Sequence, residues 1–422
     1  MGASTRVGRV LRAVDSNSDE MVRFLRDLVR TPSVTGDEAQ AQDLVRDKLR
    51  SLGGAVDYWK PRRSDFKGFK DFIAEEKNVG GRPNVVGVFH GSGRGRRLGF
   101  NGHVDVVPEG DPASWLHRPY SGTVEGRRMY GRGACDMKAG LASVIFAVQA
   151  LLESGARPSG DLVVSSVIGE ESGGMGTLAS ILRGHAADGV VIAEPTSLRL
   201  VIAQAGCLMF RLKVKGKQAH GASRYMGVSA IEKFQPVLAS LLALEDRRRT
   251  LRSHPLFRGV PNPVTLSIGK VRAGNWDSTV PEELVAEGRY GVWPGETLDS
   301  AKSQFESAVN KTAQVDEWLS RVPPEVSWFG PQWESAEISA HNWLAKLVSS
   351  ACRRAIGRRP RLAGITGGTD MRLYTNLAHV PALVFGPGDD STAHFSNESV
   401  DLDEVTKACK VYAIASLDTD GD

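Results

Sequence analysis

Imidazole and carboxylate side chains recur in this chain just after short apolar stretches that are typical of β-strands. His103 and Asp105 end the stretch R-L-G-F-N-G-H-V-D, and because they are two residues apart they would point to the same side of a strand. A carboxylate beside a histidine commonly fixes the tautomer of a metal-binding imidazole and raises its basicity. Further candidates end or follow other apolar stretches: Asp136, Glu170, Glu171, Glu194 and His394. The pattern predicts a metal site.

Two imidazoles and three carboxylates form a ligand set that suits zinc, manganese or cobalt. The five residues are His103, Asp136, Glu171, Glu194 and His394. They are too many for one open tetrahedral site, but they suit two ions about 3.5–4 Å apart that share a bridging carboxylate. Glu170 is then left as a general base. The expected cofactor is therefore a pair of divalent ions, zinc or alternatively manganese or cobalt, and the filling of only one position stays open.

Taken singly, each of these residues has an ordinary interpretation. Glu170 and Glu171 together are typical of a solvated acidic turn, and Glu194 before a proline is typical of a strand end. His394 alone is typical of a loop histidine that makes local hydrogen bonds. The joint occurrence of these residues at successive strand ends favours the metal site over these separate interpretations.

The composition limits the class of protein. At 422 residues, two domains are expected. The 53 basic residues nearly balance the 49 acidic ones, which argues against nucleic acid or an anionic membrane as partner and favours a small-molecule substrate. The four cysteines lack C-x-x-C spacing, and the longest apolar stretch, Leu141–Leu152, is too short to span a bilayer. We expect a cytoplasmic enzyme.

Strand and helix patterns alternate in the first half of the chain. Asn84–His90 and Arg97–His103 are expected to be neighbouring strands, and Leu141–Leu152 has the composition of a buried helix. Asp161–Gly169 and Gly189–Ala193 are continuous apolar strands that end in acidic residues. This alternation predicts an α/β fold with a mostly parallel sheet flanked by helices, in which ligands bind at the carboxyl ends of the strands.

The segment before these strands is predicted to be helical. Glu20–Arg30 has apolar residues at helical spacing and stops before Pro32. Thr35 and Glu38 form a capping-box pattern, which predicts a second helix through Leu52.

The pattern changes after Cys207. Strand, helix, strand, strand, helix and strand follow one another up to Phe329, which is the order of a ferredoxin-like α+β unit. We therefore expect a catalytic domain formed by residues 1–207 and 332–422, with residues 208–331 inserted as a lid or dimerisation domain.

Several motifs together resemble the M20 metallopeptidases and amidohydrolases, in particular the acetylornithine deacetylase and succinyl-diaminopimelate desuccinylase branch. They are G-H-V-D-V-V-P, Y-G-R-G-A-C-D-M-K, G-E-E-S-G-G, A-E-P-T, G-G-T-D and H-F-S-N-E. The resemblance covers nearly the whole chain and implies that His103, Asp136 and Glu194 hold one ion. It further implies that Asp136, Glu171 and His394 hold the other, with Asp136 bridging. Asp105 would support His103, and Glu170 would be the base.

The resemblance also implies roles for the inserted domain. Members of this family commonly form homodimers through it, so His220 would reach the partner's active site and stabilise the oxyanion. Arg289 would grip a substrate carboxylate with two parallel hydrogen bonds, although a charged residue on an exposed strand face fits nearly as well. The other substrate contacts expected from the motifs are Asn275, Trp276, Gly367 and Thr369.

The bond that is broken stays open among several hypotheses. An N-deacylase that acts on a non-peptide C–N bond of a small carboxylate-bearing substrate is preferred. One alternative is a hydrolytic deaminase that releases ammonia from an aromatic amine such as an aminobenzoate, because the chain is also similar overall to aromatic-amine hydrolases such as 5-nitroanthranilate aminohydrolase. A carboxypeptidase or dipeptidase is the other enzymatic alternative. A metal-containing protein that only binds its ligand is disfavoured by the complete set of ligands and base.

Overall fold

The computed structural model describes residues 2–69, 72, 76, 78–93, 95–185 and 187–419. The chain folds into two compact units. Unit 1 contains residues 1–202, 338–363 and 369–422, and unit 2 contains residues 203–337 and 364–368. The boundaries of the insertion thus fall a few residues outside the predicted 208 and 331. Residues 364–368 join unit 2, where Gly364 lies against the ring of Phe257.

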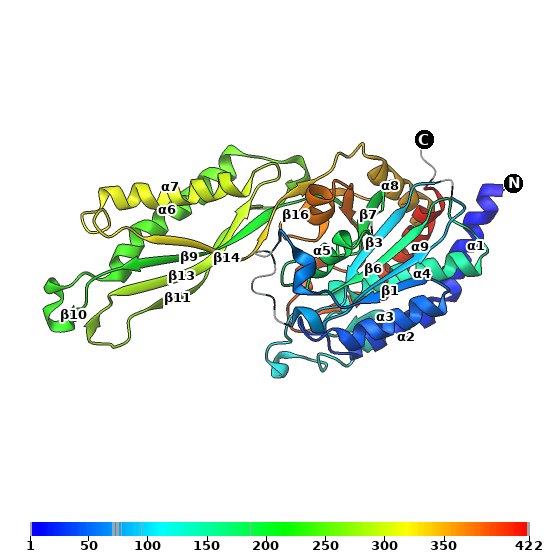
Figure 1. The fold of residues 1–422 in the computed structure, drawn as a ribbon, viewed down its shortest axis with the longest axis horizontal. Helices are drawn as coiled ribbons and strands as arrows, with labels where there is room; N and C mark the ends of the chain where they lie inside the picture. Colours follow the sequence, from blue (N-terminus) through cyan, green and yellow to red (C-terminus); the bar gives the residue numbers. More distant parts are fainter. Residues whose placement is uncertain are drawn as a thin grey trace. The chain divides into compact units, whose positions relative to one another are not determined.

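Unit 1 is built on a mixed sheet whose central strands are parallel (Figure 1). Its strands run in the order β1-β2-β6-β3-β7-β17-β8. Parallel pairing joins β6, β3, β7 and β17, whereas β1, β2 and β8 pair antiparallel at the two sides. The bounds are β1 Ala55–Trp59, β2 Asn84–Phe89, β3 Leu98–His103, β6 Leu162–Val167, β7 Gly189–Ile192, β8 Leu200–Gln204 and β17 Ala382–Val384. The predicted fold class is confirmed. The expected adjacency of β2 and β3 is wrong, because β6 lies between them.

Helices cover both faces of this sheet. Leu141 of α4 lies against Gly102, whereas the hydroxyl of Thr177 in α5 accepts a hydrogen bond from the side chain of Asn101. Neighbouring residues of a strand point to opposite sides, so α4 and α5 lie on opposite faces of the sheet. The helices are α1 Gly2–Ser16, α2 Ser18–Arg30, α3 Ala39–Ser51, α4 Ala139–Glu153, α5 Met175–Leu182, α8 Trp343–Ile356 and α9 Leu402–Leu417. With the preceding turn, α4 is long and apolar enough to cross a membrane, but it is buried in the core.

Short strands bring distant segments of unit 1 together. β18 (Ser399–Asp401) pairs with β5 (Arg128–Tyr130), which in turn pairs with β4 (Thr123–Glu125). In the chain, β5 comes shortly before the helical turn Ala134–Lys138, which contains Asp136, and β18 comes shortly after His394. The pairing of β5 with β18 therefore connects these two segments.

Unit 2 has the ferredoxin-like order of elements. Its sheet runs β11-β13-β9-β14, and α6 and α7 lie on one face of it (Figure 1). Alternate residues of β9 and β13 are buried, as expected for a sheet with one covered face. The ring of Phe210 in β9 packs on Phe305 of α7 at 4.7 Å. The bounds are β9 Gly206–Lys215, α6 Ala230–Leu251, β11 Leu266–Ala273, β13 Glu283–Val292, α7 Leu298–Val315 and β14 Glu325–Trp333.

The remaining strands of the chain are short. β10 (Ala219–His220) pairs with β12 (Thr279–Val280), and β15 (Ala336–Glu337) and β16 (Leu362–Ile365) pair with β8.

Candidate active site

The carboxyl ends of the parallel strands position the predicted ligands of unit 1. His103 is the last residue of β3, Glu170 and Glu171 follow β6, and Glu194 follows β7. Parallel strands end at the same edge of a sheet, so these side chains converge there. Asp136 comes from the turn before α4, and His394 comes from the loop between β17 and β18.

Asp136 lies between the two histidines. Its Oδ1 atom is 3.2 Å from Nε2 of His103, and its Oδ2 atom is 3.4 Å from Nε2 of His394. His103 is buried, whereas the His394 side chain is 51% exposed. The carboxylate therefore presents one oxygen to each imidazole, which is the arrangement that a bridging ligand requires.

Glutamates complete the group around each imidazole. Nε2 of His103 is 3.5 Å from Oε1 of Glu194 and 3.9 Å from Oε2 of Glu170. Nε2 of His394 is 3.0 Å from Oε2 of Glu171. The ligand atoms of His103, Asp136 and Glu171 lie close enough together to hold one ion, as do those of His103, Glu170 and Glu194.

Buried His103 Nε2 makes no hydrogen bond within the part of the chain that the structure describes. A cation among the surrounding nitrogen and oxygen donors would satisfy this atom, so the residues present fit a divalent metal centre.

Asp105 fixes the site in a different way from the one expected. The main-chain oxygen of Asp105 lies 2.8 Å from His103 Nδ1, while its carboxylate is 3.7 Å from that atom. The carboxylate instead accepts the main-chain N–H groups of Glu170 and Glu171, each at 3.2 Å, and the hydroxyl of Thr35. Asp105 therefore orients the imidazole through its backbone and holds the acidic turn with its side chain.

Negative charge around the imidazoles favours their protonated forms in the absence of metal. Burial by itself lowers the pKa of His103, but Glu194 and Asp136 outweigh it and hold that pKa well above its ordinary value. Hydrogen bonds with Asp136 and Glu171 raise the pKa of His394 to about 10.

Burial, and after it the crowding of like charges, raises the pKa values of the three glutamates in the site. Burial, with a contribution from Asp136, raises the pKa of Glu194 to about 8. Burial and then the charge of Asp370 raise the pKa of Glu170 well above its ordinary value, and burial also raises the pKa of Glu171. The metal-free site thus holds protons that a cation would have to displace.

We expect the affinity of the metal-free protein for Zn²⁺ or Co²⁺ to rise with pH between about 6 and about 9. In the metal-free protein Glu194 is mainly protonated below its pKa of about 8, and His394 is protonated below its pKa of about 10. Each group can bind a metal ion only after losing its proton, so raising the pH would remove a competitor. Calorimetric titrations in buffers of different ionisation enthalpy would measure the proton release, and an affinity independent of pH would contradict the prediction.

The predicted substrate contacts fall in both units. His220, Asn275, Trp276, Arg289 and Gly367 belong to unit 2, and Thr369 belongs to unit 1. Trp276 is 73% exposed, and Nδ1 of exposed His220 accepts the main-chain N–H of Ala222 at 3.1 Å. The buried Thr369 accepts the N–H of Met371 through its hydroxyl. The roles of these residues and the predicted homodimer stay predictions.

Arg289 is partly engaged inside unit 2. Its guanidinium donates to the hydroxyl of Thr265 at 3.0 Å and to the main-chain oxygen of Thr366 at 2.6 Å. These bonds fix the orientation of the side chain, so a substrate carboxylate would have to use its remaining N–H donors.

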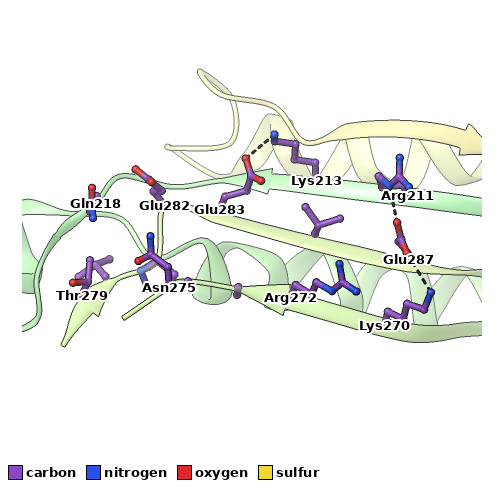
Figure 2. Close-up of a pocket in the computed structure, with 15 residues that line it drawn as sticks. Arg211, Lys213, Gln218, Lys270, Arg272, Asn275, Thr279, Glu282, Glu283 and Glu287 are labelled. Carbon is purple, nitrogen blue, oxygen red and sulfur yellow. Dashed lines mark hydrogen bonds and ion pairs between the residues drawn. The ribbon is translucent and has the colours of Figure 1, made fainter. Parts of the chain in front are cut away.

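A hollow on the sheet of unit 2 carries charges of both signs (Figure 2). Arg211 pairs with Glu287 at 2.7 Å, and Lys213 pairs with Glu283 at 2.6 Å. Asn275 also lines this hollow. These ion pairs partly offset the positive charge of Arg211 and Lys213, and both side chains keep N–H donors that are not used in the pairs.

Residues that sequence reasoning left without a role lie close to the predicted ligands. Arg132 and Glu398 form a buried ion pair beside Asp136, at 2.7 Å. The buried Asp370 accepts the hydroxyl of Thr177 at 2.5 Å. All three lie within the quoted motifs Y-G-R-G, H-F-S-N-E and G-G-T-D, so their position in these motifs was the available signal.

Comparisons with known proteins agree on one family. A family model described as peptidase family M20/M25/M40 matches residues 99–417. The chain is 26% identical over 424 residues to N-formyl-4-amino-5-aminomethyl-2-methylpyrimidine deformylase of Bacillus subtilis (strain 168), covering 95% of this chain and 94% of the relative. It is 29% identical over 411 residues to succinyl-diaminopimelate desuccinylase of Methylocella silvestris, covering 93% and 96%.

Solved structures share the fold. The dipeptidase Dug1p of Saccharomyces cerevisiae matches with a TM-score of 0.74 at 17% identity, covering 98% of this chain and 99% of that one. The YXEP protein of Bacillus subtilis, described as a dinuclear metal binding peptidase, matches with a TM-score of 0.65 at 16% identity, covering 96% and 98%.

Proposed function

The chain belongs to peptidase family M20/M25/M40, and on this premise we propose that it is an N-deacylase of small carboxylate-bearing substrates with a two-ion centre in unit 1. It is a hydrolase acting on C–N bonds, like the deformylase and desuccinylase relatives. The observation that carries the two-ion proposal is the position of Asp136, whose oxygens face His103 at 3.2 Å and His394 at 3.4 Å.

In this proposal His103, Asp136 and Glu194 hold one divalent ion, and Asp136, Glu171 and His394 hold the other. The distances of 3.5 Å from His103 to Glu194 and 3.0 Å from His394 to Glu171 support this grouping. When bound, such a pair of ions polarises the substrate carbonyl and lowers the pKa of water. Nitrogen and oxygen donors of this kind suit zinc, manganese or cobalt.

Glu170 is proposed as the base that accepts a proton from the attacking water and delivers it to the leaving nitrogen. It is buried beside the ligands, with its carboxylate farther from His103 than that of Glu194. The N–H of Glu170 donates to Asp105, which fixes the base relative to His103. In the metal-free site, burial and neighbouring acids raise its pKa.

Unit 2 is proposed to supply the remaining groups. Arg289 would hold the substrate carboxylate, and His220 of a second copy would stabilise the oxyanion. The guanidinium of Arg289 is oriented by its hydrogen bonds to Thr265 and Thr366, which supports a fixed anion-binding geometry. The other contacts proposed from unit 2 are Asn275, Trp276 and Gly367, and Thr369 of unit 1 is proposed as a further contact.

The relatives favour deacylation over the alternative reactions. The names of both relatives describe removal of an acyl group, formyl in one and succinyl in the other. Release of ammonia from an aromatic amine and cleavage of a dipeptide remain the alternatives to be tested.

A substrate panel tests this proposal. We expect protein loaded with Zn²⁺, Mn²⁺ or Co²⁺ to release formate, acetate or succinate from N-acyl amines and N-acyl amino acids. Removal of the metal by a chelator should abolish the release, and adding it back should restore it. Aminobenzoates and dipeptides serve as comparison substrates. Release of ammonia without release of an acid would indicate that the reaction is deamination rather than deacylation. Activity that survives complete metal removal would overturn the metal mechanism.

A further inference from the structure

The buried pair Arg132–Glu398 lies where two segments of the proposed metal centre meet. β18 pairs antiparallel with β5, and the pairing continues as the N–H of Gly131 donates to the main-chain oxygen of Glu398 at 2.9 Å. This register places Arg132 beside Glu398, although they are 266 positions apart in the chain. Four positions before Glu398 is His394, and four positions after Arg132 is Asp136.

Glu398 holds the backbone of the bridging ligand. Its Oε1 atom accepts the N–H of Cys135 at 2.9 Å and the N–H of Asp136 at 3.0 Å. Its Oε2 atom accepts Nη1 of Arg132 at 2.7 Å. Its side chain is 1% exposed, so these groups, rather than water, satisfy the carboxylate.

Arg132 holds the backbone of the loop that carries His394. Its Nη2 atom donates to the main-chain oxygen of His394 at 3.3 Å, and its Nη1 atom donates to that of Phe395 at 3.3 Å. The guanidinium also lies 5.2 Å from the ring centroid of Trp115. His394 has a φ of 64°, a left-handed conformation that non-glycine residues adopt only when their surroundings enforce it.

The two proposed ion positions differ in how their ligands are supported. His103 and Glu194 end or follow buried strands of the sheet, so the sheet itself fixes them. His394 is exposed on a loop, and its separation from Asp136 depends on how that loop is held. Arg132 and Glu398 hold the backbone of both residues at once.

We propose that Arg132 and Glu398 are positioning residues that set the separation of His394 from Asp136 and thereby the affinity of the second ion position. The inference rests on the proposed two-ion centre. The pair acts through main-chain groups, and neither side chain is itself a ligand. Loss of the pair should lower the affinity for the ion held by His394 and Glu171, while the affinity for the ion held by His103 and Glu194 should change little.

Co²⁺ binding to the full-length, metal-free protein tests this proposal. In Glu398→Gln an N–H₂ group replaces one of the two accepting oxygens. That group faces donors in either orientation of the amide, so the interaction with Arg132 or the one with the two main-chain N–H groups is lost. Arg132→Lys keeps the charge but loses the planar fork. We expect both variants to bind one Co²⁺ with an affinity near that of the parent chain, and the second about 10–100-fold more weakly, as is typical of residues that orient metal ligands.

Glu296→Gln is the matched control. Glu296 also forms a buried ion pair, with Arg248, and also accepts a main-chain N–H, from Trp293 at 3.0 Å, but it lies in unit 2. Circular dichroism would compare the folding of all variants. The control should bind two Co²⁺ as the parent does, which separates a specific effect on one ion from general loss of stability.

The outcomes separate the two proposals. If the parent chain binds two ions and both Arg132→Lys and Glu398→Gln retain both affinities, the positioning role is overturned while the metal centre stands. An equal loss of affinity for both ions in these variants would also overturn the positioning role, as would the same loss in Glu296→Gln. A parent chain that binds fewer than two ions would overturn the proposed centre, and the positioning role with it. If Glu398→Gln fails to fold, Arg132→Lys decides the matter by the same measurement.

Discussion

Replacing Glu170 with glutamine is expected to lower kcat by about 10²–10⁴-fold while the protein keeps two bound ions. The amide has nearly the shape of the carboxylate but cannot accept a proton from water. The main-chain N–H of residue 170 would still donate to Asp105, so the turn should keep its conformation. Steady-state kinetics on the best substrate of the panel, together with metal analysis of the same sample, would measure both effects.

The neighbouring residue provides the matched control. Glu171→Gln changes the same turn by the same chemistry, but Glu171 lies 3.0 Å from His394 and is a proposed ligand. It should lose affinity for one ion, whereas Glu170→Gln should not. Loss of an ion from Glu170→Gln would make Glu170 a ligand, because its oxygen is also grouped with His103 and Glu194 at a distance suited to metal binding. Near-normal activity in that variant would refute its role as the base.

The convergence of the strand-end residues could be predicted from the sequence because it follows from a general property of parallel sheets. Continuous apolar strands predict parallel pairing, and parallel strands present their carboxyl ends at one edge. His103, Glu171 and Glu194 therefore had to lie near one another once their strands were recognised. The insertion could be predicted for a similar reason, since the alternating burial in β9 and β13 differs from the continuous burial in β6.

The order of the strands could not be predicted in the same way. Sequence proximity suggests that β2 and β3 are neighbours, yet β6 pairs with both of them. Periodicity reports which face of a strand is buried but carries no information about which strand lies beside it. The positions of the proposed ligands did not depend on this error, because they follow from where the strands end rather than from the order of the strands.

Local motifs also failed where tertiary contacts used the same side chains. Thr35 and Glu38 match a capping box, but α3 begins at Ala39, and the Thr35 hydroxyl donates to Asp105. Glu38 instead forms a buried ion pair with Arg82. The main-chain contacts of Arg132 and Glu398 were equally hidden, because they depend on a register between segments far apart in the chain.

Replacing Asp136 with asparagine is expected to lower the affinity for each of the two ions by at least about 100-fold. This is the upper end of the loss of affinity that is typical when a residue that only supports a ligand is replaced. Asp136 faces both imidazoles, through a different oxygen for each. Asparagine retains a single carbonyl oxygen and no charge, so it can neither bridge nor offset two cations. Equilibrium dialysis of the metal-free variant against Co²⁺ would measure the two affinities.

His394→Ala is the comparison that gives this result its meaning. His394 is proposed to bind one ion only, and as an exposed loop residue it can be truncated with little effect on the core. It should lose one ion and keep the other, whereas Asp136→Asn should lose affinity for both. If Asp136→Asn lost only one ion, the two positions would be filled independently, and the shared carboxylate would not be the bridge. Asp136 would then be a ligand of one ion only, and the two ions would have separate sets of ligands, with Glu170 still available as the base.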